Sequence, residues 1–487
     1  MPIYKANDIL SMQDNPRDFS KVDRKVRMRL RTRGLPVRPA AIRVRDFEEI
    51  TCPLGAEWAR SEAARCIHCP DPAPCYKACP AQNDISQAMW LIEQGKFLEA
   101  AQVYHQTSSM PEICGRVCPT ERLCEGACVR SKKNGRTIPL GALEAFVADY
   151  ERQTVGITLP VAKPIGAKVA IIGAGPAGLT CAEQLARRGH WVTIFDARPA
   201  PGGLLTYGIP SFKLSKSVVL TKWGDLRRAG VSFVGNTYIG KARTINDLLA
   251  EGYEAVFIGV GVGSDITMNA PGEDLPGVYK ATEFLVRANV DTALLPPEMR
   301  KRPEVGERVV VIGAGDTAMD CLRTALRIGA REVTCLYRRN RKAMPSRGRD
   351  LKLALEEGAK FQFYTQPIRF TAGEDGRLAQ IECLRTRLDG RDASGRRRPI
   401  PVAGTNFIVE ADTVVLALGY RPDPTISATT PGLKARNWGL IIADPETGAT
   451  TRFGLFVGGD IVTGPNLVVT AMVAGRRAAA TIDAYLS

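Results

Sequence analysis

A chain of 487 residues has room for three or four domains, since one domain usually takes roughly 100 to 200 residues. Hydrophobic residues make up 45% and charged residues 24%, a balance that excludes a disordered or collagen-like chain. Lysine and arginine exceed aspartate and glutamate by 66 to 51, a formal net charge of +15, so nucleic-acid binding has to be considered.

The most concentrated positive charge lies in the predicted basic segment 1–50, where Arg24 to Arg33 include six cations. No aromatic residue alternates with them, as a stacking platform for single-stranded nucleic acid requires. Val26, Met28 and Leu30 instead indicate a segment that lies along a partner or along the chain's own domains. We therefore expect no nucleic-acid partner, and a nucleic-acid-binding protein is the non-enzyme alternative.

The N-terminal residues MPIYKANDIL contain neither the apolar stretch nor the cleavage site of a signal peptide. No run of about 18 apolar residues predicts a membrane span. We expect a cytoplasmic protein. Nine of the 13 cysteines fall between Cys52 and Cys128, and in a reducing compartment such crowding indicates metal ligands or redox groups rather than disulfides.

These cysteines lie in a predicted helical domain, residues 51–155, with short helical stretches such as 85–104. The helical apolar positions of that stretch are Ile85, Ala88, Met89, Ile92, Phe97 and Ala100. The cysteines form two quartets, each of which contains a Cys followed by Pro: Cys66, Cys69, Cys75 and Cys79, then Cys114, Cys118, Cys124 and Cys128. This spacing resembles the ferredoxin run that binds 4Fe-4S clusters, and structural zinc is the alternative.

From Lys168 onward, runs rich in valine and isoleucine end in glycine and alternate with helical patterns, as in a parallel sheet covered on both faces. The predicted strands lie in KVAIIGAG, WVTIFDA, AVFIGVGVG, RVVVIGAG, EVTCLYRR and TVVLALG. The first glycine motif consists of Gly173, Gly175, Pro176, Ala177 and Gly178, and Asp196 closes the next strand. Glycines for a tight turn, a helix N-terminus for a pyrophosphate and an acid for a ribose hydroxyl predict a dinucleotide site.

Two further stretches indicate that this first site binds FAD. Gly203 and Leu204 follow Asp196 in the run GGLLTYGIP, which has no place in a simple dehydrogenase. Gly459 and Asp460 end a later strand before a helical pattern, where a carboxylate and a helix dipole can face a flavin. The C-terminal residues are therefore expected to complete the FAD domain.

The second glycine motif, Gly313-Ala-Gly315 followed by Asp316 and Thr317, also lies between a strand and a helix. Its next strand ends in Arg338 and Arg339 instead of an acid. Arginine can pair with the 2′-phosphate of NADP, which a carboxylate would repel, so NADPH is favoured over NADH. A pair of solvated arginines is the alternative.

The predicted fold class is α/β: two Rossmann-like dinucleotide-binding domains preceded by an α-helical iron-sulfur domain. The FAD-binding domain is expected at residues 166–285 and 421–487, with the NADP-binding domain inserted at 286–420.

Over nearly its whole length the sequence resembles the small (beta) subunit of NADPH-dependent glutamate synthase. The motifs that match are RCIHC, CYKACP, PEICGRVCPTERLCEGAC, VAIIGAGPAGL, GGLLTYGIPSFKL, VVVIGAGDTAMDC, CLYRRNRKAMP and GGDIV. The same module is found in the N-terminal half of dihydropyrimidine dehydrogenase and in the large subunit of the bifurcating NADH-dependent reduced ferredoxin:NADP oxidoreductase.

The resemblance implies two 4Fe-4S clusters. It assigns one cluster to Cys66, Cys69, Cys75 and Cys128, and the other to Cys79, Cys118, Cys124 and Glu144, with Cys114 as the competing fourth ligand. It also implies that electrons pass from NADPH through FAD and the clusters to a large FMN-containing partner subunit in a hetero-oligomer. No residue acts as a catalytic acid or base, because the hydride moves between bound cofactors. The chain shows no glutaminase nucleophile motif of its own, and a bifurcating oxidoreductase or a pyrimidine dehydrogenase is the alternative assembly.

Overall fold

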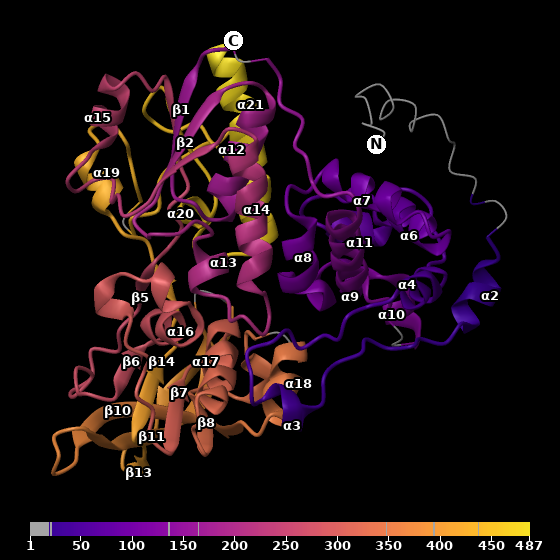
Figure 1. Ribbon diagram of the computed structural model, residues 1–487. Coiled ribbons are helices and arrows are strands. Elements are labelled where there is room, and N and C mark those ends of the chain that lie inside the picture. Colours follow the sequence, from indigo (N-terminus) through magenta and orange to yellow (C-terminus); the bar gives the residue numbers. More distant parts are fainter. Residues whose placement is uncertain are drawn as a thin grey trace. The chain divides into compact units, whose positions relative to one another are not determined.

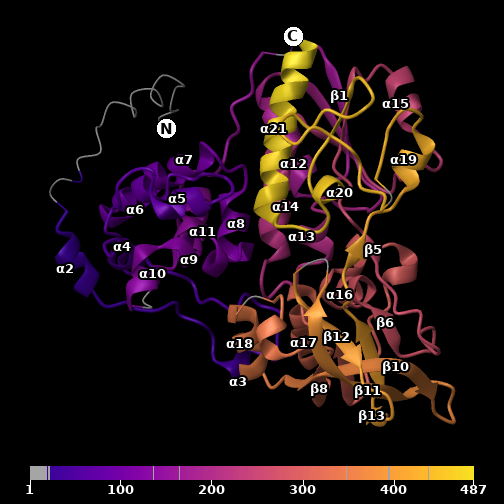
Figure 2. The ribbon, with the colours of Figure 1, turned by 180° about the vertical axis from the view of Figure 1, so that it is seen from behind.

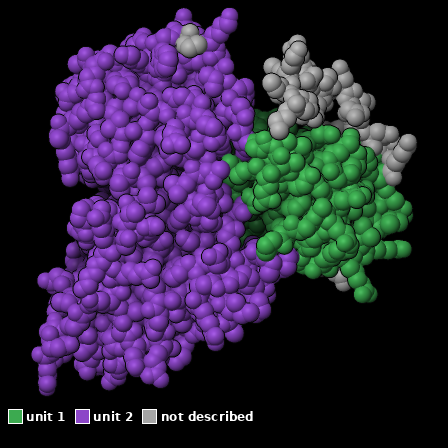
Figure 3. Space-filling view, viewed as in Figure 1, with its two compact units in different colours: residues 1–35, 53–115, 120–156 green, residues 36–52, 116–119, 157–487 purple. Residues whose placement is uncertain are grey.

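The computed structural model describes residues 19, 22–134, 137–163, 165–346, 348–392, 395–436 and 438–487. These residues form two compact units, which Figure 3 shows in different colours. A helical unit lies within residues 1–35, 53–115 and 120–156, and an α/β unit comprises residues 36–52, 116–119 and 157–487. No helix in the described part of the chain has the length and apolar character needed to cross a membrane.

The helical unit is built from short helices packed around one apolar core (Figure 1). They are α2 Arg24–Arg29, α4 Ala56–Ala63, α5 Pro74–Ala78, α6 Ile85–Glu93, α7 Phe97–His105, α8 Pro111–Val117, α9 Cys124–Ala127, α10 Val129–Asn134 and α11 Leu140–Thr154, of which α8 continues into residues 116–119 of the other unit. The predicted helical stretch 85–104 is two helices, α6 and α7, because the chain turns at Gly95, where φ is +79°. All six of its predicted apolar positions are buried.

The core of this unit supports the cysteine-bearing loops. Phe97 packs edge-on against Phe146, with ring centroids 5.1 Å apart. Cys66, Cys75 and Cys79 lie against the same core. These cysteines, of which Cys75 lies in the short helix α5 and Cys66 in a loop, are therefore held against packed helices.

The basic run 24–33 lies along the helical unit. Of the two predicted arrangements, along a partner or along the chain's own domains, this is the second. Arg24 donates a hydrogen bond to the carbonyl oxygen of His68 at 2.9 Å. Arg27 donates to the carbonyl oxygens of Ala64 and Cys66 at 2.9 and 3.0 Å and pairs with Glu93 at 2.8 Å. Part of the concentrated positive charge therefore binds the chain's own backbone beside the first cysteines.

The α/β unit contains two parallel five-stranded sheets with the same strand arrangement. The first has the order β16-β4-β1-β2-β3, with β1 Lys168–Ile172, β2 Trp191–Phe195, β3 Ser232–Val234, β4 Ala255–Ile258 and β16 Leu455–Val457. The second has the order β6-β14-β7-β8-β9, with β6 Val278–Lys280, β7 Arg308–Ile312, β8 Glu332–Tyr337, β9 Lys360–Phe363 and β14 Thr413–Leu416. All six predicted strand runs form strands of these sheets.

The remaining elements of this unit connect or cover the sheets. Its helices are α3 Ala40–Arg43, α12 Pro176–Arg187, α13 Leu204–Tyr207, α14 Lys216–Arg228, α15 Ile245–Ala250, α16 Ala281–Asn289, α17 Asp316–Arg327, α18 Gly348–Glu356, α19 Thr425–Thr429, α20 Asp460–Thr463 and α21 Val468–Leu486. Its other strands are β5 Ser264–Asp265, β10 Thr365–Ala372, β11 Leu378–Arg391, β12 Arg397–Pro401, β13 Phe407–Glu410 and β15 Tyr420–Arg421. Strands β10 to β13 form an antiparallel sheet, which the sequence analysis did not predict.

Two features of the structure bear on the predicted domain boundaries, which stay predictions. The second sheet already includes β6 at Val278–Lys280, before the predicted boundary at residue 286, because this strand pairs with β14, which lies far along the chain. The predicted segment 1–50 is not one piece, because residues 36–52 pack with the α/β unit, and residues 116–119 of the predicted helical domain do the same. The return of β16 to the first sheet agrees with the expected completion by C-terminal residues.

Helices α12 and α21 lie side by side in Figure 1 and in the reverse view of Figure 2. The two can approach because Gly475 of α21 faces the backbone of α12. A Cβ atom at Gly475 would collide with the carbonyl oxygen of Ala177. The C-terminal helix is thereby held against the helix that follows the first glycine motif.

We expect Gly475→Ala to lower the free energy of unfolding of the α/β unit by about 1 to 3 kcal/mol, as overpacking of a dense contact does. Gly224→Ala is the matched control, because a Cβ there lies 3.5 Å from the flexible end of Arg228. A helical glycine in open surroundings is less stable than alanine by roughly 0.5 to 1 kcal/mol, so this change should stabilise. Denaturant unfolding followed by circular dichroism measures both, and equal effects would contradict the close contact.

Candidate functional site

The first glycine motif forms a tight turn between β1 and α12. Gly173 has φ +101°, and a Cβ atom there would lie 2.6 Å from the carbonyl oxygen of Gly259. A Cβ atom at Gly178 would collide with the carbonyl oxygen of Gly173. Helix α12 starts after Gly175 with Pro176 in its first turn, which leaves backbone N–H groups at its N-terminus without partners in the helix. This end of the helix can bind a phosphate.

Asp196, at the end of β2, is tied to this turn. Its carboxylate accepts hydrogen bonds from the backbone N–H of Ala174 at 2.7 Å and of Arg198 at 2.8 Å. Burial raises the pKa of Asp196, and these two hydrogen bonds oppose the rise. A carboxylate has about four acceptor positions, so Asp196 can still accept a ribose hydroxyl as predicted.

Two segments distant in sequence meet the same turn. Gly203 has φ +51°, and a Cβ atom there would lie 2.7 Å from the Cα atom of Gly175, while Leu204 beside it is 48% exposed. Gly459 has φ +82°, and a Cβ atom there would lie 3.2 Å from the Cβ atom of Ala177. Burial raises the pKa of Asp460 to about 6. The structure therefore brings together the residues predicted to bind FAD.

The second glycine motif repeats the first in the other sheet. Gly313 has φ +128°, and a Cβ atom there would collide with the carbonyl oxygen of Ala417. Helix α17 starts at Asp316 after Gly315, as in the first motif. The Tyr420 hydroxyl donates to Thr317 Oγ1 at 3.3 Å, and burial raises the pKa of Tyr420 to about 12. Tyr420 is a site residue that the sequence analysis missed, because it lies about a hundred positions beyond the motif.

The two predicted phosphate-binding arginines differ in their surroundings. Arg339 is buried, pairs with Asp392 at 2.6 Å and donates to the carbonyl oxygen of Arg397 at 2.9 Å. Its guanidinium therefore binds the antiparallel sheet, and its role beside Arg338 at the 2′-phosphate stays a prediction. Arg338 is exposed. Desolvation and the positive charges of Arg339 and Arg396 lower its pKa, and the charge of Asp392 opposes this effect. Its guanidinium is therefore open to an anion from solvent.

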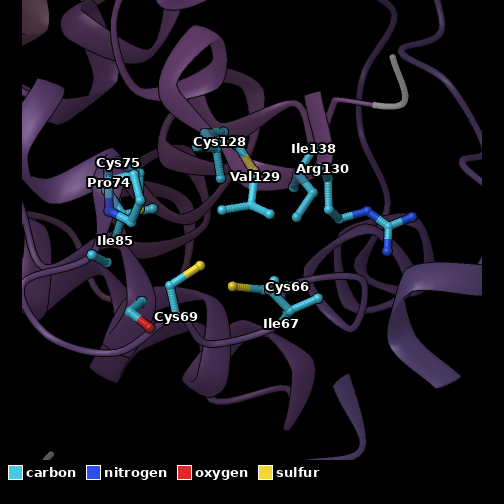
Figure 4. Close-up of a pocket in the computed structure, with 13 residues that line it drawn as sticks. Cys66, Ile67, Cys69, Pro74, Cys75, Ile85, Cys128, Val129, Arg130 and Ile138 are labelled. Carbon is cyan, nitrogen blue, oxygen red and sulfur yellow. The ribbon is translucent and has the colours of Figure 1, made fainter. Parts of the chain in front are cut away.

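Cys66, Cys69, Cys75 and Cys128 line one pocket in the helical unit (Figure 4). The sulfur atoms of Cys66 and Cys69 point into the space between the labelled side chains. Burial raises the pKa of the Cys66 and Cys69 thiols and raises that of Cys75 to about 12. These are the four cysteines predicted to hold one cluster, and a pocket lined by four thiols fits a group that binds thiolates.

Two other features of this pocket bear on its chemistry. Arg130, which also lines it, is buried and donates to the carbonyl oxygen of Leu30 at 2.8 Å. Its positive charge suits a negatively charged group in the pocket, and the sequence analysis did not single it out. Across the described ranges, no three His, Cys, Asp or Glu side chains are arranged to hold a single metal ion.

The second predicted ligand set is centred on Glu144 of α11. Glu144 is buried and accepts a hydrogen bond from Asn83 Nδ2 at 3.4 Å. Burial, together with the charge of Glu112, raises its pKa to about 8.

Tyr104 connects Glu144 with two of the predicted cysteines. Its hydroxyl is buried without a hydrogen-bond partner among the described residues. Its pKa is raised by burial and by the charges of Glu144, Cys124 and Cys79. The buried Tyr104 hydroxyl, which has no hydrogen-bond partner among these side chains, is compatible with a cluster bound beside it. Cys118 lies in residues 116–119, which belong to the α/β unit, so its place in this set stays a prediction, as does the choice between Glu144 and Cys114.

Comparison with known domain families gives two matches. Residues 43–155 match dihydropyrimidine dehydrogenase domain II, 4Fe-4S cluster, and residues 167–475 match pyridine nucleotide-disulphide oxidoreductase. The second match covers more than half of the chain. The two glycine turns lie within the second match and all eight predicted cluster ligands lie within the first.

Three relatives show how far the similarity extends. The Escherichia coli K12 protein AegA is 44% identical over 451 residues, which cover 90% of this chain and 67% of AegA. The glutamate synthase (NADPH) small chain of the same organism is 41% identical over 464 residues, covering 93% of this chain and 96% of the relative. The NADP(+)-dependent formate dehydrogenase subunit beta of Moorella thermoacetica is 39% identical over 438 residues, covering 85% and 60%.

Among solved structures, FprA from Mycobacterium tuberculosis is similar with a TM-score of 0.56 and 24% identity. The match covers 66% of this chain and 85% of FprA. At this identity it supports the fold with its two nucleotide-binding sheets.

We expect Arg338→Ala to weaken NADPH binding roughly 10- to 100-fold, because a charge-assisted hydrogen bond contributes about 1.5 to 3 kcal/mol. NADH lacks the 2′-phosphate, so its binding should stay unchanged. Arg331→Ala is the matched control, since Arg331 precedes β8 where Arg338 follows it, and it pairs with Glu307 at the surface. Titration with each nucleotide, followed by flavin absorbance, measures the two affinities. Equal losses of NADPH and NADH affinity would contradict the assignment of Arg338 to the 2′-phosphate.

We expect Glu144→Ala to lower the iron and acid-labile sulfide content from about eight to about four atoms each per chain, as loss of one 4Fe-4S cluster requires. Cys114→Ala should leave both contents unchanged. Metal and sulfide analysis of the anaerobically purified variants distinguishes the two residues. The reverse pattern would assign the fourth ligand to Cys114, and zinc in place of iron would overturn the cluster assignment.

Proposed function

The chain belongs to the family of glutamate synthase (NADPH) small chains within the pyridine nucleotide-disulphide oxidoreductases, and on this premise we propose that it is the electron-input subunit of a larger enzyme. It is an NADPH-dependent flavin oxidoreductase with a 4Fe-4S domain. The proposal adds that two clusters take electrons from the flavin to a large partner chain, most readily the glutamate synthase large subunit.

One observation carries the proposal: the chain combines two glycine turns with a separate pocket lined by four cysteines. FAD, when bound, accepts a hydride as an electron pair and can release its electrons singly, which 4Fe-4S clusters carry. A flavin enzyme that passed hydride only between small molecules would have no use for such a cysteine domain. The cysteines indicate that electrons leave the polypeptide one at a time.

The chain's own residues act by binding and orienting. The N-terminus of α17 and Arg338 would hold NADPH, with Tyr420 fixing Thr317 at the start of that helix. The N-terminus of α12 and Asp196 would hold FAD. No side chain is needed to take up or give a proton for the hydride to move between the two.

The partner chain determines which reaction the electrons serve. Glutamate synthase small chains match along 95 to 96% of their own length in two organisms, which favours glutamate formation. A bifurcating oxidoreductase, a pyrimidine dehydrogenase or a formate dehydrogenase would use the same module with another partner. The similarity to a formate dehydrogenase subunit at 39% identity makes this the second candidate.

Anaerobic purification of the affinity-tagged chain from its native cells, followed by mass spectrometry of the bound chain, tests the proposal. We expect a large chain with a glutaminase domain and FMN, and glutamate formation from glutamine and 2-oxoglutarate that depends on NADPH. The isolated chain should reduce artificial acceptors with NADPH and form no glutamate. Recovery of a formate dehydrogenase or a small flavoprotein in its place would overturn the choice of partner.

A further inference from the structure

Residues 36–52, which we call the strap, form a short loop within the α/β unit. The strap is closed at its base, because Val37 forms a β-bridge with Thr51 and the backbone N–H of Arg38 donates to the Ile50 carbonyl oxygen at 2.9 Å. Helix α3 lies at its middle. The sequence of the strap contains no nucleotide-binding motif. Its packing within the α/β unit therefore needs another explanation.

On one side the strap is held by helices α17 and α18 of the second nucleotide-binding domain. Arg43 is 3% exposed and pairs with Glu357 at 2.7 Å and with Glu356 at 2.7 Å. Glu357 also accepts from Arg323 at 2.9 Å and Arg327 at 2.7 Å, both on α17. Burial alone would raise the pKa of Glu357, but the hydrogen bonds from Arg323 and Arg327 lower it to about 2, so it stays ionised.

On the other side the strap is held by the loop that follows α13 in the first nucleotide-binding domain. The backbone N–H of Ile50 donates to the Phe212 carbonyl oxygen at 3.1 Å, and Glu49 accepts from the backbone N–H of Ser215 at 3.0 Å. Phe212 is fully buried, and its ring lies under the guanidinium groups of Arg323 and Arg327, 4.5 and 4.1 Å from the centroid.

A direct contact between the two domains lies beside the strap. Lys213 of the same loop pairs with Asp320 of α17 at 2.8 Å and with Asp350 of α18 at 2.9 Å. Elsewhere the chain passes between the two sheets through β5 and β15, which pair over two residues each. Such a short pair of strands can act as a hinge, because few hydrogen bonds oppose a rotation about it.

We propose that the strap is a positioning element for hydride transfer, in which Arg43 holds the NADP-binding sheet in a fixed orientation to the FAD-binding sheet. The inference rests on the assignment of FAD to the Gly173 turn and NADPH to the Gly313 turn. Buried ionic contacts suit this task, since their geometry is specific and loss of one partner leaves a buried charge unpaired. Arg43 and Glu357 belong to neither glycine turn, so we expect them to act on distance and angle and not on nucleotide affinity.

Arg43→Gln tests the proposal, with Arg45→Gln as the matched control, because Arg45 is exposed two positions further along the same strap. In single-turnover experiments at saturating NADPH, Arg43→Gln should slow flavin reduction about 10-fold or more per FAD-containing molecule, since a misplacement of about 1 Å can cost about 100-fold. The dissociation constant of NADPH should stay unchanged. Arg43→Lys should restore part of the rate.

Hydrogen exchange of peptides from α18 and from the strap supplies a readout that does not depend on activity, and both peptides should exchange faster in Arg43→Gln than in the control. A role in stability alone would lower FAD content and leave the rate per occupied molecule at the wild-type value, which would overturn the proposal. If Arg43→Gln fails to bind FAD, Glu49→Ala decides in the same assay. Wild-type rates in that variant, with faster exchange in the strap, would also overturn the proposal.

Discussion

The whole α/β unit depends on close contact between backbone and backbone at two glycine turns. At Gly173 and Gly313 the chain leaves a strand with positive φ and passes so near a neighbouring carbonyl group that no side chain fits. Because the turn is this tight, the following helix points its N-terminus at the end of the sheet, where anions bind. At the first turn the contacts of Gly203 and Gly459 add segments from distant parts of the chain. One steric constraint thus shapes the nucleotide site and draws the C-terminal part of the chain into the first sheet.

The contacts of individual arginines show where part of the net charge of +15 is used. Arg24 and Arg27 bind backbone carbonyl groups beside the cysteine pocket, where they order the loop that carries Cys66 and Cys69. Arg43 and its neighbours neutralise buried carboxylates between the two sheets. These arginines bind other parts of the same chain. The charge of Arg338 can pair with an anion. Part of the positive charge is therefore used in contacts within the chain itself.

Local patterns predicted the local structure well. Strands rich in valine and isoleucine, the two glycine turns and the helical apolar positions follow from neighbours in sequence. The four cysteines that line one pocket are those that the family resemblance assigns to one cluster, and not those of one sequence quartet. The features that the sequence did not predict depend on distant partners. Arg339 pairs with Asp392 across the antiparallel sheet, and β6 joins its sheet only by pairing with β14. Residues 36–52 have no pattern that predicts their contact with α17 and α18, because it consists of buried charges matched across some 300 positions.

We expect electrons to enter this chain as a pair from NADPH and to be shared with iron-sulfur clusters. The most direct measurement is an anaerobic titration with NADPH, in which flavin bleaching and the paramagnetic signals of reduced clusters are followed in the same sample. We predict an uptake of about four electrons per chain, two by FAD and one by each of two clusters, as these cofactors allow. Uptake that ends at about two electrons, with the flavin reduced and the clusters still oxidised at any excess of NADPH, would contradict the account.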